Sequence, residues 1–93
     1  MVRMAAHTTT VSLTGGSPQN VTFSRTDFGF TDEEVILAFP RVGNSTGLYE
    51  DVASSYSFFP GTSDSKVCIT RLYSSKAESN MPVTVIVLYR NKA

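Results

Sequence analysis

The sequence predicts an all-β domain, a six-stranded antiparallel β-sandwich, and three observations support this prediction. Six segments of about five to ten residues are rich in Val, Ile, Thr and aromatic residues, as strands are. Clusters of Gly, Pro, Asn and Ser, which are typical of turns, separate them. No segment has the apolar spacing and length of a three-turn helix. The 93 residues are expected to form a single domain with a thin two-layer core.

The first half of the chain opens with two alternating segments. Residues 7–14 (HTTTVSLT) place apolar side chains on one face and hydroxyl groups on the other, as in a half-buried strand. Residues 20–24 (NVTFS) alternate in the same way, and the turn residues at 15–18 lead us to predict a hairpin. Residues 1–6 are expected to be disordered or derived from an expression vector, with Met4 a candidate natural start.

A helical signal at residues 31–34 (TDEE) is outweighed by the short apolar segment after it. The four residues have the form of a capping box, but only residues 35–39 (VILAF) separate them from Pro40. That leaves no room for three helical turns. We therefore predict a turn with at most one helical turn, and then a buried strand over residues 34–39.

The second half contains three further predicted strands. Residues 41–47 (RVGNSTG) are predicted to be a loop, and residues 49–59 a strand with a bulge near residues 53–55. Residues 66–73 (KVCITRLY) are predicted to be a strand in which each of the two faces could pack against other residues. Residues 74–81 are predicted to be a polar loop.

Residues 82–90 (PVTVIVLYR) are predicted to be the central strand of the fold. One face carries Val83, Val85, Val87 and Tyr89, and the other carries Ile86 and Leu88. Since both faces are apolar, both need cover. A second sheet supplies one cover, and either loops or a neighbouring subunit supply the other.

Charge and composition exclude several classes of function. Eight basic and eight acidic residues give no net charge, so nucleic-acid binding is disfavoured. No segment is long and apolar enough to insert into a membrane, and the first ten residues lack the apolar middle of a signal peptide, so we expect a soluble chain. The single cysteine, Cys68, excludes an internal disulfide, which favours oligomerisation as the source of added stability.

No catalytic or metal-binding constellation is recognisable. The single histidine, His7, is interpreted as a surface residue, since no nucleophile motif accompanies it. The acidic residues 32–34 and 50–51 are interpreted as solvated charges at turns or strand starts. Cys68 lies between apolar residues and is expected to be an inert core residue. We therefore expect no enzyme, no cofactor and no metal.

Aromatic and arginine side chains are the candidates for ligand binding, because rings stack on the apolar face of a sugar while polar groups bind its hydroxyls. The alternative is that the tyrosines are ordinary strand residues at the sheet margin. Alternation places Arg71 on the side of Val67 and Ile69, so Asp51 or Asp64 is expected to pair with it. The candidate ligand-binding residues are Arg41, Asn44, Tyr49, Asp51, Arg71 and Tyr73.

Three segments, TTTVSLTGGSPQNVTFS, EVILAFPRV and PVTVIVLYRNKA, together resemble the C-terminal receptor-binding domains of bacteriophage tail fibres with an H-type lectin-like fold. The resemblance implies a sandwich that forms a homotrimer around a three-fold axis and buries one sheet face between subunits. It also implies that the protein is part of the phage tail and recognises a glycan on the bacterial surface. The chain has no tryptophan, and Tyr89 takes the place of the aromatic residue in the last strand. The loops at residues 41–49 and 74–81 are the expected contact regions.

The alternative is a structural virion protein, for capsid decoration or tail assembly, that binds no carbohydrate. In that case the apolar faces and the sheet edges would serve only to join subunits.

Overall fold

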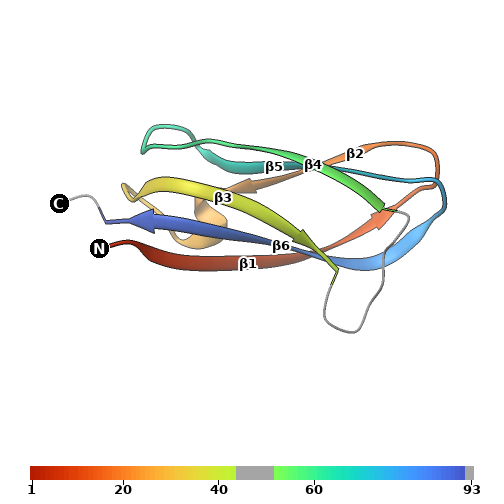
Figure 1. Ribbon diagram of the computed structural model, residues 1–93, viewed down its shortest axis with the longest axis horizontal. Coiled ribbons are helices and arrows are strands. Elements are labelled where there is room, and N and C mark those ends of the chain that lie inside the picture. The colour runs from red at the N-terminus through yellow and green to blue at the C-terminus, as the bar shows by residue number, and fades with distance from the viewer. Residues whose placement is uncertain (44–51, 92–93) are drawn as a thin grey trace.

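The computed structural model describes residues 1–43 and 52–91 and confirms the predicted all-β sandwich. Two three-stranded antiparallel sheets pack face to face in an elongated molecule of 46 × 24 × 17 Å (Figure 1). Sheet A has the order β1 (Arg3–Leu13), β6 (Glu78–Arg90) and β3 (Glu34–Val42). Sheet B has the order β2 (Gln19–Ser24), β5 (Lys66–Ser74) and β4 (Val52–Phe58).

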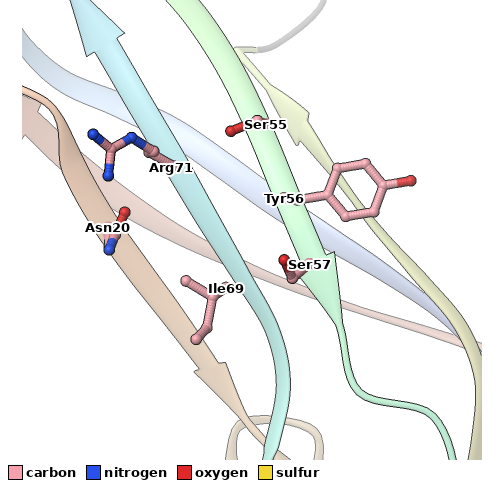
Figure 2. A pocket seen from close by; sticks show the side chains of 6 residues that line it. All are labelled: Asn20, Ser55, Tyr56, Ser57, Ile69 and Arg71. Atoms are coloured by element: carbon pink, nitrogen blue, oxygen red, sulfur yellow. The ribbon is translucent and has the colours of Figure 1, made fainter.

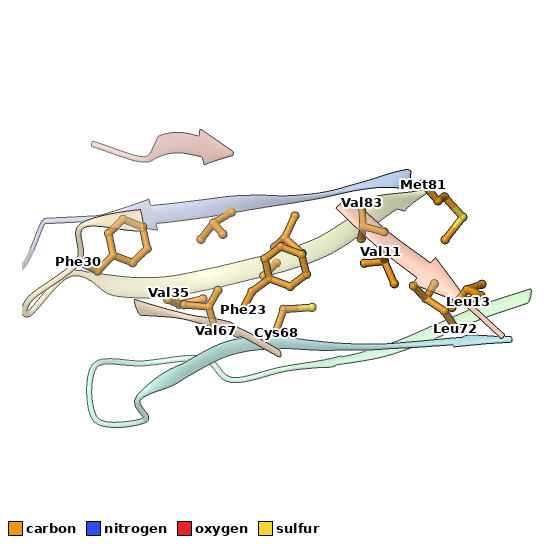
Figure 3. Packing of buried hydrophobic residues seen from close by; sticks show 13 residues of the cluster. Val11, Leu13, Phe23, Phe30, Val35, Val67, Cys68, Leu72, Met81 and Val83 are labelled. Atoms are coloured by element: carbon orange, nitrogen blue, oxygen red, sulfur yellow. The ribbon is translucent and has the colours of Figure 1, made fainter. Parts of the chain in front are cut away.

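The core lies between the two sheets. On β6, the inward-facing Val83, Val85 and Val87 are fully buried, and β6 is the central strand of its sheet, as predicted. Sheet B contributes Phe23 and Leu72 from the opposite side (Figure 3). The polar side chains that are buried with them are satisfied, since no buried side-chain nitrogen or oxygen in the described residues lacks a hydrogen-bond partner.

The central strand β6 is longer than predicted. It begins at Glu78, so the predicted loop over residues 74–81 is wrong, and only residues 75–77 separate β5 from β6. The added residues pair with β1, with Val11 opposite Met81 and a register shift before Leu13. At this irregularity Asn80 has a φ of 54° and its N–H donates to Ser12 Oγ at 3.3 Å. Burial of Leu13 and Met81 explains why pairing extends this far.

The predicted hairpin between the first two strands is wrong, because β1 pairs with β6 and β2 pairs with β5. Residues 15–18 instead carry the chain from one sheet to the other. Gly16 N–H donates to the Ser74 carbonyl at 2.9 Å, and a Cβ on Gly15 would lie 2.8 Å from the Ser75 carbonyl. This crossover stabilises the sandwich, because it places the apolar faces of β1 and β2 in opposite sheets, where both are buried in the same core.

The beginning of β1 also differs from expectation. The strand starts at Arg3, and residues 3–6 pair with residues 86–89 of β6. Residues 3–6, which belong to the segment expected to be disordered or vector-derived, therefore extend an edge strand.

The one helical turn in the described residues lies earlier than the sequence suggested. It is a 3₁₀ helix, η1 (Arg25–Phe28), in which Ser24 N–H donates to Asp27 Oδ2 at 2.8 Å and Gly29 ends the turn with a φ of 69°. Residues 31–34 form no helix. There Thr31 N–H donates to Glu33 Oε1 at 2.6 Å, which confirms the predicted turn before β3.

The position of the bulge in sheet B differs from the prediction and changes which side chains of β5 face the core. No bulge occurs at residues 53–55, because β4 pairs regularly with β5 from Val52 to Phe58. A register shift occurs instead between β2 and β5, where Val67 has no paired residue on β2. As a result Val67 and Cys68 both lie in the core (Figure 3). The prediction that Arg71 shares a face with Val67 is therefore wrong.

The predicted loop at residues 41–47 is wrong at its start, because β3 continues through Arg41 to Val42, and residues 44–47 lie outside the described residues. Pro40 has no backbone N–H, and it is accommodated within β3 because this strand is at the edge of sheet A. On the open side of an edge strand no backbone N–H is needed for pairing with a neighbouring strand.

Candidate functional site

The two sheets present outer faces of different chemistry. On sheet A, two adjacent outward-facing rows across the three strands carry only apolar side chains, and we call this surface the apolar face. It consists of Met4, Ala6, Leu37, Phe39, Ile86 and Leu88. The strand register places these residues in two rows across the sheet. Leu88 of β6 is at the centre of one row, and Ile86 of β6 is at the centre of the other.

The apolar face is bounded by polar contacts at both ends. At one end Arg90 Nε donates to Glu34 Oε1 at 2.8 Å, and at the other the Thr8 and Thr84 hydroxyls lie 2.7 Å apart. The side chains of the apolar face are not part of the core cluster in the described residues, and Met4 is 71% exposed. Among the described residues, the second face of the central strand, which the sequence showed to be apolar, is thus less buried than the first face.

On sheet B the outer face is polar and hollowed. Two adjoining shallow depressions, of about 230 and 190 Å³, share Ser55 and Arg71, and we call them together the Arg71 depression. Arg71 of β5 lies opposite Asn20 of β2 on one side and Ser55 of β4 on the other (Figure 2). The remaining lining residues are Ala53, Ser54, Tyr56, Ser57, Ile69 and Tyr73.

Tyr56 and Tyr73 differ in their relation to Arg71. Tyr73 lies two residues beyond Arg71 on β5 and therefore faces the same side of the sheet. The ring of Tyr56 points away from Arg71, across β4 (Figure 2). Both rings are exposed, at 42% for Tyr73 and 46% for Tyr56, so both are accessible to solvent.

Of the two partners that the sequence suggested for Arg71, Asp64 is engaged by another residue. Asp64 pairs with Lys66, whose Nζ lies 3.2 Å from Asp64 Oδ1 and whose backbone N–H donates to the same oxygen at 2.9 Å. The hydrogen bond from the Lys66 backbone has the largest effect, and together these contacts hold the pKa of Asp64 below its usual range. Asp51 lies outside the described residues. Within residues 1–43 and 52–91 Arg71 makes no ion pair and no side-chain hydrogen bond.

The structure brings together two of the six candidate ligand-binding residues. Arg71 and Tyr73 share the outer face of β5, whereas Arg41 lies on sheet A, opposite Thr84. The other three candidates, Asn44, Tyr49 and Asp51, lie outside the described residues.

Asn20, Ser55 and Ser57 belong to the site but were not among the candidates. Each lies at an outward position of a strand that the sequence predicted, so alternation alone could have selected them. What was missing was the strand order, because it is the position of β5 between β2 and β4 that joins these residues to Arg71.

His7 is half-buried, which corrects its interpretation as a surface residue. Its ring meets the rings of Phe23 and Phe28 edge-on, at centroid distances of 6.2 and 5.9 Å. Cys68 is fully buried, and this burial raises the pKa of its thiol. In the part of the chain that the structure describes, no three His, Cys, Asp or Glu side chains gather in a way that could hold a metal ion.

Among the described residues, no helix is long and apolar enough to cross a bilayer.

Arg25 is a buried charged residue at 8% exposure, and its contacts are structural. Its Nη2 donates to the carbonyls of Thr31 at 3.2 Å and Glu33 at 2.6 Å, and its guanidinium lies 5.8 Å from the centroid of the Phe30 ring. Arg25 thus fixes residues 31–33 against η1, away from both outer faces.

Replacing Arg25 with Met is expected to lower the free energy of unfolding by about 2 kcal/mol, because two hydrogen bonds from a charged donor are lost. Urea denaturation of both proteins measures this difference. Arg3→Met, at an exposed cation, should change the free energy by less than about 0.5 kcal/mol. Equal effects of the two substitutions would contradict the structural role of Arg25.

The fold and its outer faces define the chain as an antiparallel β-sandwich with one apolar face and one polar depression. Comparisons with protein-family models, with curated proteins and with solved structures gave no match.

Proposed function

We propose that this chain is the non-catalytic receptor-binding tip of a bacteriophage tail fibre or related tail protein, and that it attaches to a bacterial surface glycan as a homotrimer. The resemblance of three sequence segments to such domains supports the assignment to a phage tail, and hence to the virion. The two outer faces support the two parts of the activity, self-association and glycan binding.

The observation that carries the proposal is the Arg71 depression. It combines a cation, an amide, several hydroxyls and an accessible aromatic ring on one sheet face. These are the groups that recognise a sugar, because hydroxyls of the ligand need donors and acceptors while its apolar face packs on a ring. The lining residues come from paired strands, whose backbone hydrogen bonds fix the relative positions of the side chains before a ligand binds.

The apolar face supports the homotrimer. A domain of this size gains little stability from its core alone, and covering Ile86, Leu88 and their neighbours with a further copy would add apolar burial. Three copies would also convert a weak single-site affinity into avidity for a repeating surface glycan.

We expect Tyr73→Ala to lose glycan binding without a change in oligomeric mass, because the ring lies at the depression but not on the apolar face. Binding is measured on an array of bacterial glycans, and mass by size-exclusion chromatography with light scattering. The control is Ile36→Ala, which truncates a similarly exposed large side chain on β3, in the other sheet and outside the depression. If Tyr73→Ala binds glycans as well as Ile36→Ala does, the Tyr73 ring is not part of the binding site.

The second candidate function is a structural virion protein, in capsid decoration or tail assembly, without carbohydrate binding. The apolar face favours it, since subunit contacts alone would explain that surface. A trimer that binds no glycan on the array would favour this candidate. A trimer whose glycan binding depends on Tyr73 would exclude it.

A further inference from the structure

Arg71 occupies the centre of the depression that bears its name. Along β5, Ile69 and Tyr73 lie on either side of it, about 7 Å away at strand spacing. Across the sheet, Asn20 and Ser55 are its neighbours at about 4.8 Å between strands. Its guanidinium therefore has neutral groups that offer hydrogen bonds on both neighbouring strands (Figure 2), and the Tyr73 ring lies two residues further along β5.

Within residues 1–43 and 52–91, no lining residue of the depression balances the charge of Arg71. Among the described residues that line either hollow, Arg71 is the one charged side chain, and no Asp or Glu lies with it. The nearest acidic residue in the sequence before β5, Asp64, is engaged by Lys66. A neutral sugar would leave this charge without a counter-ion, whereas an anionic sugar would supply one.

We propose that the Arg71 depression binds an acidic saccharide, with a sugar carboxylate held by the Arg71 guanidinium and the sugar ring placed against Tyr73. A planar guanidinium binds a carboxylate through two parallel hydrogen bonds. A single cation matches the single negative charge of a carboxylate better than the nearly double charge of a phosphate monoester. Asn20 and Ser55 then remain to bind ring hydroxyls beside the carboxylate. This inference rests on the proposed glycan-binding function and specifies the class of glycan.

The test compares acidic oligosaccharides with their own carboxyl-reduced forms. The panel contains oligosaccharides that end in glucuronate, galacturonate or N-acetylneuraminate, each paired with the reduced form, together with neutral bacterial glycans. Binding is measured by titration calorimetry on the full chain. We expect at least one acidic member to bind about tenfold or more tightly than its reduced form.

Substitutions then assign that preference to Arg71. Arg71→Gln should abolish the difference between acidic and reduced forms, and Arg71→Lys should retain a smaller one, because lysine keeps the charge and loses the planar fork. Arg3→Gln is the matched control, since it removes an exposed arginine from the other sheet and leaves the same net charge as Arg71→Gln. It should leave the preference intact.

The outcomes separate this inference from the proposed function. Equal binding of acidic and reduced forms, binding of neutral glycans alone, or a preference that survives Arg71→Gln would overturn the acidic-saccharide inference and leave glycan binding standing. Absence of binding to every member of the panel would overturn both.

Discussion

Replacing Ile86 with lysine is expected to convert the proposed trimer into a monomer. Ile86 lies at the middle of the apolar face, on the central strand of sheet A, between Ala6 of β1 and Phe39 of β3. In the single chain this side chain is only half-buried, so a lysine there can reach water and the sandwich should fold. In a trimer that covers the apolar face, each copy would instead bury an unpaired charge, which costs several kcal/mol.

Light scattering coupled to size-exclusion chromatography measures this change. We expect the wild type at roughly three times the 10.1 kDa chain mass and Ile86→Lys near the mass of one chain. The matched control is Ile69→Lys, which makes the same substitution on the central strand of sheet B, at the outer face. It should leave the mass unchanged and weaken glycan binding, because Ile69 lines the Arg71 depression. A monomeric wild type, or a trimer that persists in Ile86→Lys, would refute the assigned interface.

Replacing Phe23 with alanine is expected to remove about 4 kcal/mol from the free energy of unfolding. Phe23 is 1% exposed and is among the largest fully buried side chains (Figure 3). Its ring meets the His7 ring of the opposite sheet edge-on. Its truncation loses both the transfer free energy of the ring and the contacts across the resulting cavity. A domain of this length has a total stability of about 5–14 kcal/mol, so the loss is a large share of it.

The measurement is best made in the Ile86→Lys background, because assembly would add a concentration-dependent contribution to the stability of both proteins. Chemical denaturation should show a lower midpoint with an unchanged slope. Tyr56→Ala, at an exposed ring, is the control and should cost less than about 1 kcal/mol. A similarly small effect of Phe23→Ala would mean that the two sheets do not pack on each other around this ring.

The sequence by itself determined the fold class and the two-faced nature of the central strand. Alternation of Val83, Val85 and Val87 with Ile86 and Leu88 is a local property, since successive side chains of a strand point to opposite faces whatever the strand pairs with. For the same reason the sequence could predict that Tyr73 and Arg71 share one face of their strand, because they are two residues apart.

Only the tertiary structure decided which strands are neighbours. The short segment between β1 and β2 contains dense turn residues and suggests a hairpin, but burial of both apolar faces favours a crossover to the other sheet. Likewise the bulge at Val67, which returns that residue to the core and leaves Ile69 and Arg71 outside, reflects pairing with β2 and has no local signal. The Arg71 depression exists because β5 lies between β2 and β4, and strand order depends on contacts between residues distant in sequence.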